Sequence, residues 1–202
     1  GYYDYDNPYD AQIEGLANFK GDVVHPQFWP KDLDYSGKKV VVIGSGATAV
    51  TIVPVLAEKA SHVTMLQRTP TWYAARPSKD WIANSLRKIM PEKWAYNITR
   101  WKNVKMQDLT YRIARDNPKK VIDKLEKPMK KELGDKYVKE DYTPPYGPWE
   151  QRLCLVPDGD MFKAIAAGKA DLKTGHIETV TESGIKLTSG ETLDADVIVT
   201  AT

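Results

Sequence analysis

The segment of this sequence that could do chemistry most directly is a pair of glycines at the end of an apolar run. The run is Val40–Ile43, and the segment after it consists of Gly44, Ser45, Gly46, Ala47, Thr48 and Ala49. In a GxGxxG/A turn, the first glycine permits a tight turn off a strand and the second lets the backbone approach a pyrophosphate. The small last residue lets the following helix pack on the strand, and free N–H groups at the helix start bind the phosphates. These six residues are therefore predicted to bind a dinucleotide; the alternative is a turn that binds nothing.

The residues after the next strand predict which nucleotide is bound. NAD-binding folds usually place an acidic residue there for the ribose hydroxyls, whereas this sequence has Gln67, Arg68 and Thr69. The Arg68 guanidinium can pair with a 2'-phosphate through two charge-assisted hydrogen bonds, and Thr69 can donate its hydroxyl. We therefore expect NADP(H); the alternative for Arg68 is an ordinary surface arginine.

A second motif, FxGxxxHxxxWP, precedes the glycine turn. Its fixed positions are Phe19, Gly21, His25, Trp29 and Pro30. Together with the glycine turn behind it, this motif resembles the fingerprint of Baeyer-Villiger monooxygenases, which use FAD and NADPH to insert one oxygen atom of O2 beside a ketone carbonyl. The resemblance extends through 65–70, 101–104 and 148–159, and is closest to the actinobacterial type that oxidises ketones and activates thioamide prodrugs.

The resemblance implies roles for further residues. In such enzymes NADPH reduces FAD, O2 adds to the reduced flavin, and the resulting peroxyflavin attacks the substrate. Arg152 matches the arginine that stabilises the peroxyflavin anion and orients the nicotinamide, a role that suits a permanently charged guanidinium. Gln151 stands where several family members have a lysine that helps to hold the 2'-phosphate, which leaves more of that task to Arg68. His25 is expected to couple domain motion to turnover, and not to transfer protons.

The family also has an FAD-binding glycine turn, and no such turn precedes Gly44 in this sequence. By the resemblance, Gly1 and the final pair Ala201–Thr202 lie at the hinges that join the NADPH domain to the FAD domain. We therefore expect an NADP(H)-binding fragment of a larger FAD-dependent enzyme, inactive on its own. The substrates expected for the whole enzyme are O2 and a small ketone or sulfur compound.

The elements that position these residues indicate an α/β, Rossmann-like fold with a parallel sheet. Apolar periodicity predicts a strand over 40–43, a helix over 47–60, a strand over 62–66 and a last buried strand over 197–200. Alternating residues predict a β-hairpin or meander over 177–187. The expected division is a linker with the fingerprint at 1–37, a βαβ unit at 38–71, a helical insertion at 72–150 and the rest of the α/β core at 151–202.

The helical insertion carries most of the positive charge. Residues 72–150 hold 18 Lys and Arg against 11 Asp and Glu, and five of the six tryptophans. Trp94, Ile98, Trp101 and Leu109 recur at helical spacing, with Pro91 placed to open that helix and Pro118 to separate it from the next. The lysines are interpreted as a solvated helical face, because no nucleic-acid-binding motif accompanies them.

Composition places few further limits. With 42% hydrophobic and 28% charged residues, no long apolar run and no leader, the sequence is typical of a soluble, cytoplasmic protein without a membrane span. The single cysteine, Cys154, is expected to be a small buried residue, and no metal site is predicted.

Two other functions stay open, and a third is disfavoured. A pure NADP(H)-binding module would have no activity, and a flavin monooxygenase of another type would oxidise sulfides or amines. A short-chain dehydrogenase needs a Tyr-x-x-x-Lys pair after the glycine turn, and Tyr35 and Lys39 lie before it.

Overall fold

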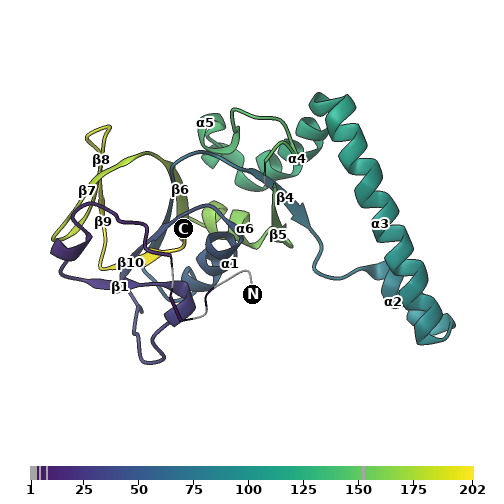
Figure 1. The fold of residues 1–202 in the computed structure, drawn as a ribbon, viewed down its shortest axis with the longest axis horizontal. Helices are drawn as coiled ribbons and strands as arrows, with labels where there is room; N and C mark the ends of the chain where they lie inside the picture. Colours follow the sequence, from purple (N-terminus) through teal and green to yellow (C-terminus); the bar gives the residue numbers. More distant parts are fainter. Residues whose placement is uncertain (1–3, 5, 8, 152) are drawn as a thin grey trace.

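The fold is built around one parallel sheet of five strands. The computed structural model describes residues 4, 6–7, 9–151 and 153–202. The strands of the main sheet lie in the order β1-β10-β2-β3-β6, and every neighbouring pair is parallel (Figure 1). They are β1 (Asp22–Val24), β2 (Lys39–Ile43), β3 (His62–Gln67), β6 (Ala170–Thr174) and β10 (Val197–Thr200).

The two faces of this sheet are covered by different layers. Helices α1 (Ala47–Leu56) and α6 (Asp160–Ala166) pack on one face, against alternate strand residues such as Val40 and Val42. The other face, which includes Val41 and Ile43, packs against a three-stranded antiparallel sheet. That sheet consists of β7 (Ile177–Thr181), β8 (Gly184–Leu187) and β9 (Thr192–Asp194). Since both faces of the parallel sheet are covered, its central strands are continuous apolar runs.

The helical insertion is bracketed by a parallel pair of strands, β4 (Trp72–Arg76) and β5 (Leu153–Pro157). Between them lie α2 (Trp81–Ile89), α3 (Glu92–Asp116), α4 (Pro118–Leu133) and α5 (Lys139–Tyr142). Short 3-10 turns occur at Leu16–Asn18, Pro26–Phe28 and Gly134–Lys136. Figure 1 shows α2 and α3 extending away from the sheet as a helical hairpin, with α4 between α3 and the core.

Most of the predicted elements are confirmed, and the differences are local. Pro91 is the N-cap of α3 and Pro118 is the first residue of α4, as the sequence predicted. The insertion does not begin with helix, because residues 72–76 form β4. Likewise, the segment 1–37 is more than a linker, since β1 adds an edge strand to the main sheet. Within the described part of the chain, no helix is both long and apolar enough to cross a bilayer.

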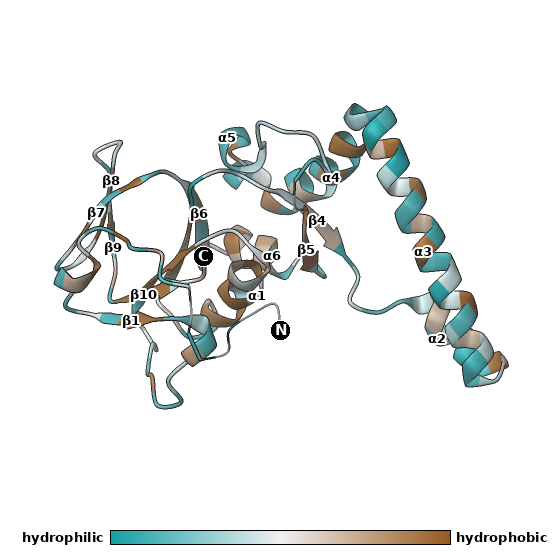
Figure 2. Ribbon diagram, in the orientation of Figure 1, coloured by the Kyte–Doolittle hydropathy of each residue, from teal (hydrophilic) through white to brown (hydrophobic). Residues whose placement is uncertain are grey.

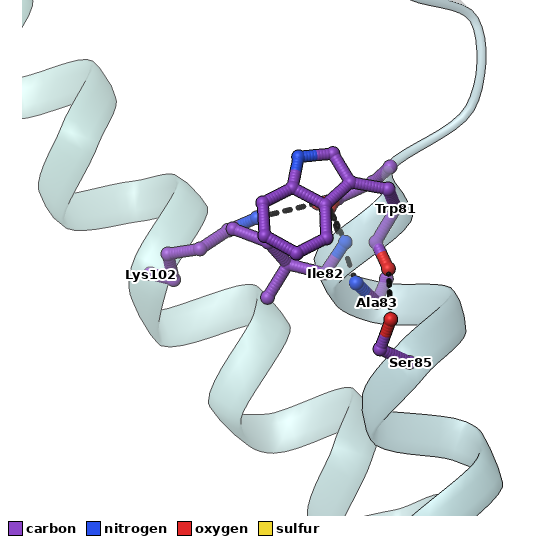
Figure 3. A network of polar contacts seen from close by, with 6 residues as sticks. Trp81, Ile82, Ala83, Ser85 and Lys102 are labelled. Carbon is purple, nitrogen blue, oxygen red and sulfur yellow. Dashed lines mark hydrogen bonds and ion pairs between the residues drawn. The ribbon is translucent and has the colours of Figure 1, made fainter.

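Asp80 fixes the position of α2 against α3. Its carboxylate accepts hydrogen bonds from the backbone N–H groups of Ile82 and Ala83 at 3.0 and 3.1 Å, which caps α2. It also pairs with Lys102 of α3 at 2.6 Å (Figure 3). The hydrogen bond from Lys102, followed by those from the backbone, holds the pKa of the Asp80 carboxyl below its ordinary value. One side chain therefore joins the two helices of the hairpin.

Asp80→Ala is expected to destabilise the hairpin, and Asp80→Asn less so, because asparagine keeps the cap and loses the ion pair. Since the pKa is lowered in the folded state, the stabilisation is present above the ordinary pKa of an aspartate. It is lost as the pH falls through the lowered folded value. Urea unfolding followed by circular dichroism at neutral and at acidic pH measures this. An equal urea midpoint for wild type and Asp80→Ala at neutral pH would contradict it.

Candidate nucleotide-binding site

The glycine turn lies between the carboxyl ends of three parallel strands. Gly44 directly follows β2 and has φ +127°, a conformation that other residues rarely adopt. Its N–H donates to the Leu66 carbonyl at the end of β3, at 2.8 Å. A Cβ at Gly44 would lie 2.4 Å from the Ala201 carbonyl oxygen, just after β10. Only glycine therefore fits at the point where β2, β3 and β10 end together.

Helix α1 begins with unpaired donors. Gly46 is its N-cap, and no side chain caps this end of the helix. The first intrahelical bond runs from the Val50 N–H to the Gly46 carbonyl at 3.1 Å. The N–H groups of Ala47, Thr48 and Ala49 consequently have no acceptor within the helix, as at any helix start. Such a start can bind a phosphate group through these donors and the helix dipole.

Arg68 and Thr69 follow β3 directly, and both side chains are exposed. The preceding Gln67 is fully buried and donates to the Asp141 carbonyl and to Thr174, at 2.6 and 2.9 Å. Gln67 therefore has a structural role, and it fixes the backbone from which Arg68 projects. Among the described residues, no carboxylate forms an ion pair with Arg68, so its guanidinium is available to an anionic ligand.

A single cavity of about 900 Å³ connects these groups. Its volume lies in the range of small-molecule and cofactor sites. It opens at the edge of the main sheet where the parallel strands end. There, β2 has β3, the next strand of the sheet along the chain, as one neighbour, and β10, from the end of the chain, as the other. Such a switch point is where open α/β sheets bind ligands. The predicted residues that line it are Gly44, Ser45, Gly46, Arg68, Thr69 and Gln151, while Ala47, Thr48 and Ala49 form the adjoining first turn of α1.

Sequence reasoning did not identify His176 and Tyr146, which are two of the further residues that line the cavity. His176 is exposed and lines the cavity just after β6. The neighbouring Gly175 N–H donates to the Gln67 carbonyl at 2.9 Å, so the turn with His176 lies beside the Arg68 segment. Tyr146 also lines the cavity and donates to Thr71 at 3.2 Å, which ties the insertion to the loop after β3. The sequence alone does not show that these residues reach the cavity. His176 does so because β6 pairs with β3, and Tyr146 does so because the end of the insertion lies beside the loop after β3.

The FxGxxxHxxxWP residues lie around β1 and away from the cavity, and their predicted role in coupling domain motion to turnover stays a prediction. Gly21 cannot accept a side chain, because a Cβ would lie 2.2 Å from the Asp196 carbonyl oxygen. His25 Nδ1 accepts the Gln27 N–H at 3.2 Å, and Trp29 packs edge-on against Tyr35. Phe19 is buried under the three-stranded sheet. Among the described lining residues of the cavity, none comes from this motif, which instead shapes the segment around β1.

The remaining predicted residues are Arg152, Pro30 and Cys154. Arg152 lies outside the described residues. Pro30 accepts the Leu33 N–H through its carbonyl, at 3.4 Å, in the turn after Trp29. Cys154 is buried, as expected, and its Sγ donates to the carbonyl of Ser45 at 3.5 Å. In the described part of the chain, no three His, Cys, Asp or Glu side chains gather as they would around a metal ion.

Comparisons with known proteins agree with this geometry. A model of the pyridine nucleotide-disulphide oxidoreductase family matches residues 1–128. The probable FAD-binding monooxygenase AlmA of Acinetobacter baylyi is 48% identical over 203 residues, which cover 100% of this chain and 41% of that protein. The FAD-containing monooxygenase EthA of Mycobacterium tuberculosis is 48% identical over 204 residues, which cover 100% of this chain and 42% of that protein. The chain thus spans less than half the length of these relatives.

Solved structures with the same fold include flavin monooxygenases. An oxidised steroid monooxygenase bound to NADP matches with a TM-score of 0.71 and 21% identity, over 97% of this chain and 44% of that one. OTEMO in complex with FAD and NADP matches with a TM-score of 0.72 and 22% identity, over 97% of this chain and 45% of that one. At these identities the likeness concerns the fold, and it confirms the predicted Rossmann-type architecture.

Proposed function

The chain belongs to the pyridine nucleotide-disulphide oxidoreductase family, and from this premise we propose that it binds NADP(H) in the cavity at the carboxyl edge of its main sheet. One observation carries the proposal. The cavity joins the Gly44–Gly46 turn, which leads into the uncapped start of α1, to the exposed Arg68. The pyrophosphate binds at the turn and helix start, and the 2'-phosphate binds at Arg68 and Thr69.

The polar groups that line the cavity each have a separate task in nucleotide binding. The N–H groups at the start of α1 hold the pyrophosphate without a counter-charge from a side chain. Arg68 selects NADP(H) over NAD(H), because a guanidinium pairs with a phosphate dianion far better than with two hydroxyls. Gln151 lines the same cavity as a neutral residue and leaves Arg68 as the main cation for the 2'-phosphate. In this assignment His176 and Tyr146 form the walls beside the nucleotide.

We further propose that the whole protein is an FAD-dependent Baeyer-Villiger monooxygenase, in which residues 1–202 form the NADP(H)-binding domain. When bound, FAD would supply the redox chemistry, accepting electrons from NADPH and activating O2. The residues of this chain offer no second dinucleotide site for FAD. The sequence contains one GxGxxG/A turn, and we assign that turn to NADP(H). The support is the sequence likeness to FAD-containing monooxygenases and the FxGxxxHxxxWP motif. The second candidate is a monooxygenase that acts on sulfides or amines, because the names of the same relatives mention FAD and give no substrate.

Product analysis with the whole protein tests this function. With FAD, NADPH and a ketone, we expect ester or lactone to form in step with NADPH oxidation. Oxidation of an added sulfide without any conversion of ketones would favour the second candidate. NADH supporting the same rate as NADPH would contradict the assignment of the cavity.

The preference for NADP(H) is expected to depend on Arg68. Arg68→Ala should remove most of the difference in affinity between NADP+ and NAD+, about 1.5–3 kcal/mol for a charge-assisted contact. Competition binding of the two nucleotides measures the difference. Arg76→Ala is the matched control, because Arg76 is an exposed arginine outside this cavity. If Arg68→Ala weakened NADP+ and NAD+ equally, the 2'-phosphate would not be bound by Arg68.

A further inference from the structure

The turn after β6 brings a histidine to the same side of the cavity as Arg68. Gln67, the last residue of β3, pairs in parallel with Thr174, the last residue of β6. The next residue after β6, Gly175, donates its N–H to the Gln67 carbonyl at 2.9 Å. Arg68 and His176 therefore follow the ends of two hydrogen-bonded strands, and both line the cavity.

The order of the strands places His176 beyond Arg68, as seen from the glycine turn. Strands β2, β3 and β6 are neighbours in that order, and adjacent strands lie about 4.8 Å apart. A nucleotide with its pyrophosphate after β2 and its 2'-phosphate at Arg68 therefore extends toward the turn after β6. Figure 2 shows hydrophilic residues in β6 and hydrophobic residues in β10. The cavity thus ends at a polar edge strand, where a phosphate group can stay solvated.

His176 and Arg68 are the side chains of the described cavity lining that can carry a positive charge. The other ionisable side chains of this lining are the phenols of Tyr9 and Tyr146, which are never cations. Within the described residues, no aspartate, glutamate or lysine side chain lines the cavity. The carboxylates on the segments packed beside it also lie outside its lining; they are Asp10, Glu14 and Asp141.

The charged groups on the strands around this turn are paired with one another. Lys186 of β8 pairs with Glu178 of β7 at 2.8 Å, and Glu191 pairs with Lys173 of β6 at 2.9 Å. None of these four residues lines the cavity. The imidazole of His176 forms no hydrogen bond or ion pair with another residue of the described chain. Its ring nitrogens are therefore available to a ligand in the cavity.

We infer that protonated His176 is a second contact for the 2'-phosphate, and that it makes the preference for NADP(H) depend on pH. The inference rests on the proposed binding of NADP(H) in this cavity. Histidine is the side chain that ordinarily changes its charge between pH 5 and 8. The imidazolium has two N–H donors, and a phosphate dianion accepts charge-assisted hydrogen bonds from it. When NADP+ binds, the imidazole therefore takes up a proton from the solvent.

A neutral His176 has a different effect. It would stack on the adenine ring, as aromatic side chains do. Adenine is common to NADP+ and NAD+, so stacking would contribute equally to both affinities and would not require a proton. The two nucleotides, compared at two pH values, therefore separate a contact with the 2'-phosphate from a contact with the base.

Titration of the whole protein with NADP+ and NAD+ at about pH 6.5 and about pH 8.5 tests the inference. At the lower pH, His176→Asn should reduce the affinity for NADP+ about 3- to 10-fold, because the contact is charge-assisted but exposed to solvent. At the higher pH the loss should be less than about twofold, because the imidazole is then neutral. The affinity for NAD+ should not change. The phosphate itself takes up a proton near about pH 6, but equally for both proteins, so the ratio of their affinities reports His176.

Proton uptake gives an independent measurement. Calorimetry near about pH 7.5, in two buffers with different heats of ionisation, should show that the wild type takes up about a few tenths of a proton more than His176→Asn when NADP+ binds. His176→Lys should keep the affinity for NADP+ at both pH values without this uptake, because an ammonium group stays charged throughout. All variants should keep the wild-type circular dichroism.

His62→Asn is the matched control. His62 is at the start of β3, the opposite end of that strand from Arg68, and pairs with Asp171 of β6 at 3.3 Å. This variant loses a histidine from the same pair of strands, away from the cavity. It should bind both nucleotides as the wild type does, with the same proton uptake.

Two results would overturn the inference and leave the proposed function intact. The first is a wild type that prefers NADP+ while His176→Asn shows the same affinities at both pH values. The second is an equal loss of affinity for NADP+ and NAD+ in His176→Asn, because His176 would then contact a part that the two nucleotides share. A wild type without preference for NADP+ at either pH would contradict the proposed function, and this inference with it.

Discussion

Gly44→Ala is expected to lower the free energy of unfolding by about 3 kcal/mol or more and to abolish measurable nucleotide binding. Two effects add at this position. An alanine is strained at φ +127°, and its Cβ would meet the Ala201 carbonyl oxygen at 2.4 Å. Relief of that contact must separate the ends of β2 and β10, which form one wall of the cavity. Urea unfolding and NADP+ titration of the same variant measure the two effects.

Gly37→Ala is the control for this prediction. Gly37 also has a positive φ, +68°, but a Cβ there would meet no atom within 4 Å. Gly37→Ala should therefore lower the free energy of unfolding only by the backbone strain, about 1 kcal/mol, and leave nucleotide affinity unchanged. Equal losses of stability for the two variants would show that the contact with Ala201 has no influence.

Arg152→Ala is expected to reduce the oxygenated product formed per NADPH consumed by about 10²- to 10³-fold in the whole protein. The arginine guanidinium is permanently charged, so it can stabilise the negative charge that develops during oxygen activation and does not itself lose a proton. This proposal comes from the sequence resemblance alone, because Arg152 lies outside the described residues. Folding and NADP+ affinity should stay close to those of the wild type.

The assay must follow NADPH oxidation and product separately. If Arg152 acts on oxygen transfer, NADPH is still consumed and product is lost. Arg76→Ala, at an exposed arginine outside the cavity, should leave the ratio unchanged. A normal ratio of product to NADPH in Arg152→Ala would contradict a catalytic role for this residue.

The part of the fold that could be predicted is the part encoded by neighbouring residues. The strand-turn-helix at 40–56 has an apolar run, two glycines and helical periodicity in direct succession, so it needed no knowledge of distant contacts. By contrast, β1 has three residues, and β6 alternates with Asp171 and Lys173. Their strand character comes from pairing with β10 and β3, which are far away in the sequence.

The candidate site shows the same limit. Gly44 and Arg68 could be predicted because each directly follows a predicted strand. His176 and Tyr146 reach the cavity only through the order of the strands and the return of the insertion. Helical spacing likewise placed Trp94 and Trp101 on one face of a helix. It could not show that this face is exposed, because periodicity does not reveal what packs against a helix.

The most direct test of nucleotide binding is calorimetric titration of residues 1–202 with NADP+ and with NAD+, after circular dichroism has shown that the chain is folded. We expect one site per chain and an affinity for NADP+ about 10- to 100-fold higher than that for NAD+, because one charge-assisted phosphate contact contributes about this much. Equal affinity for the two nucleotides, or no binding of either by the folded chain, would contradict the account.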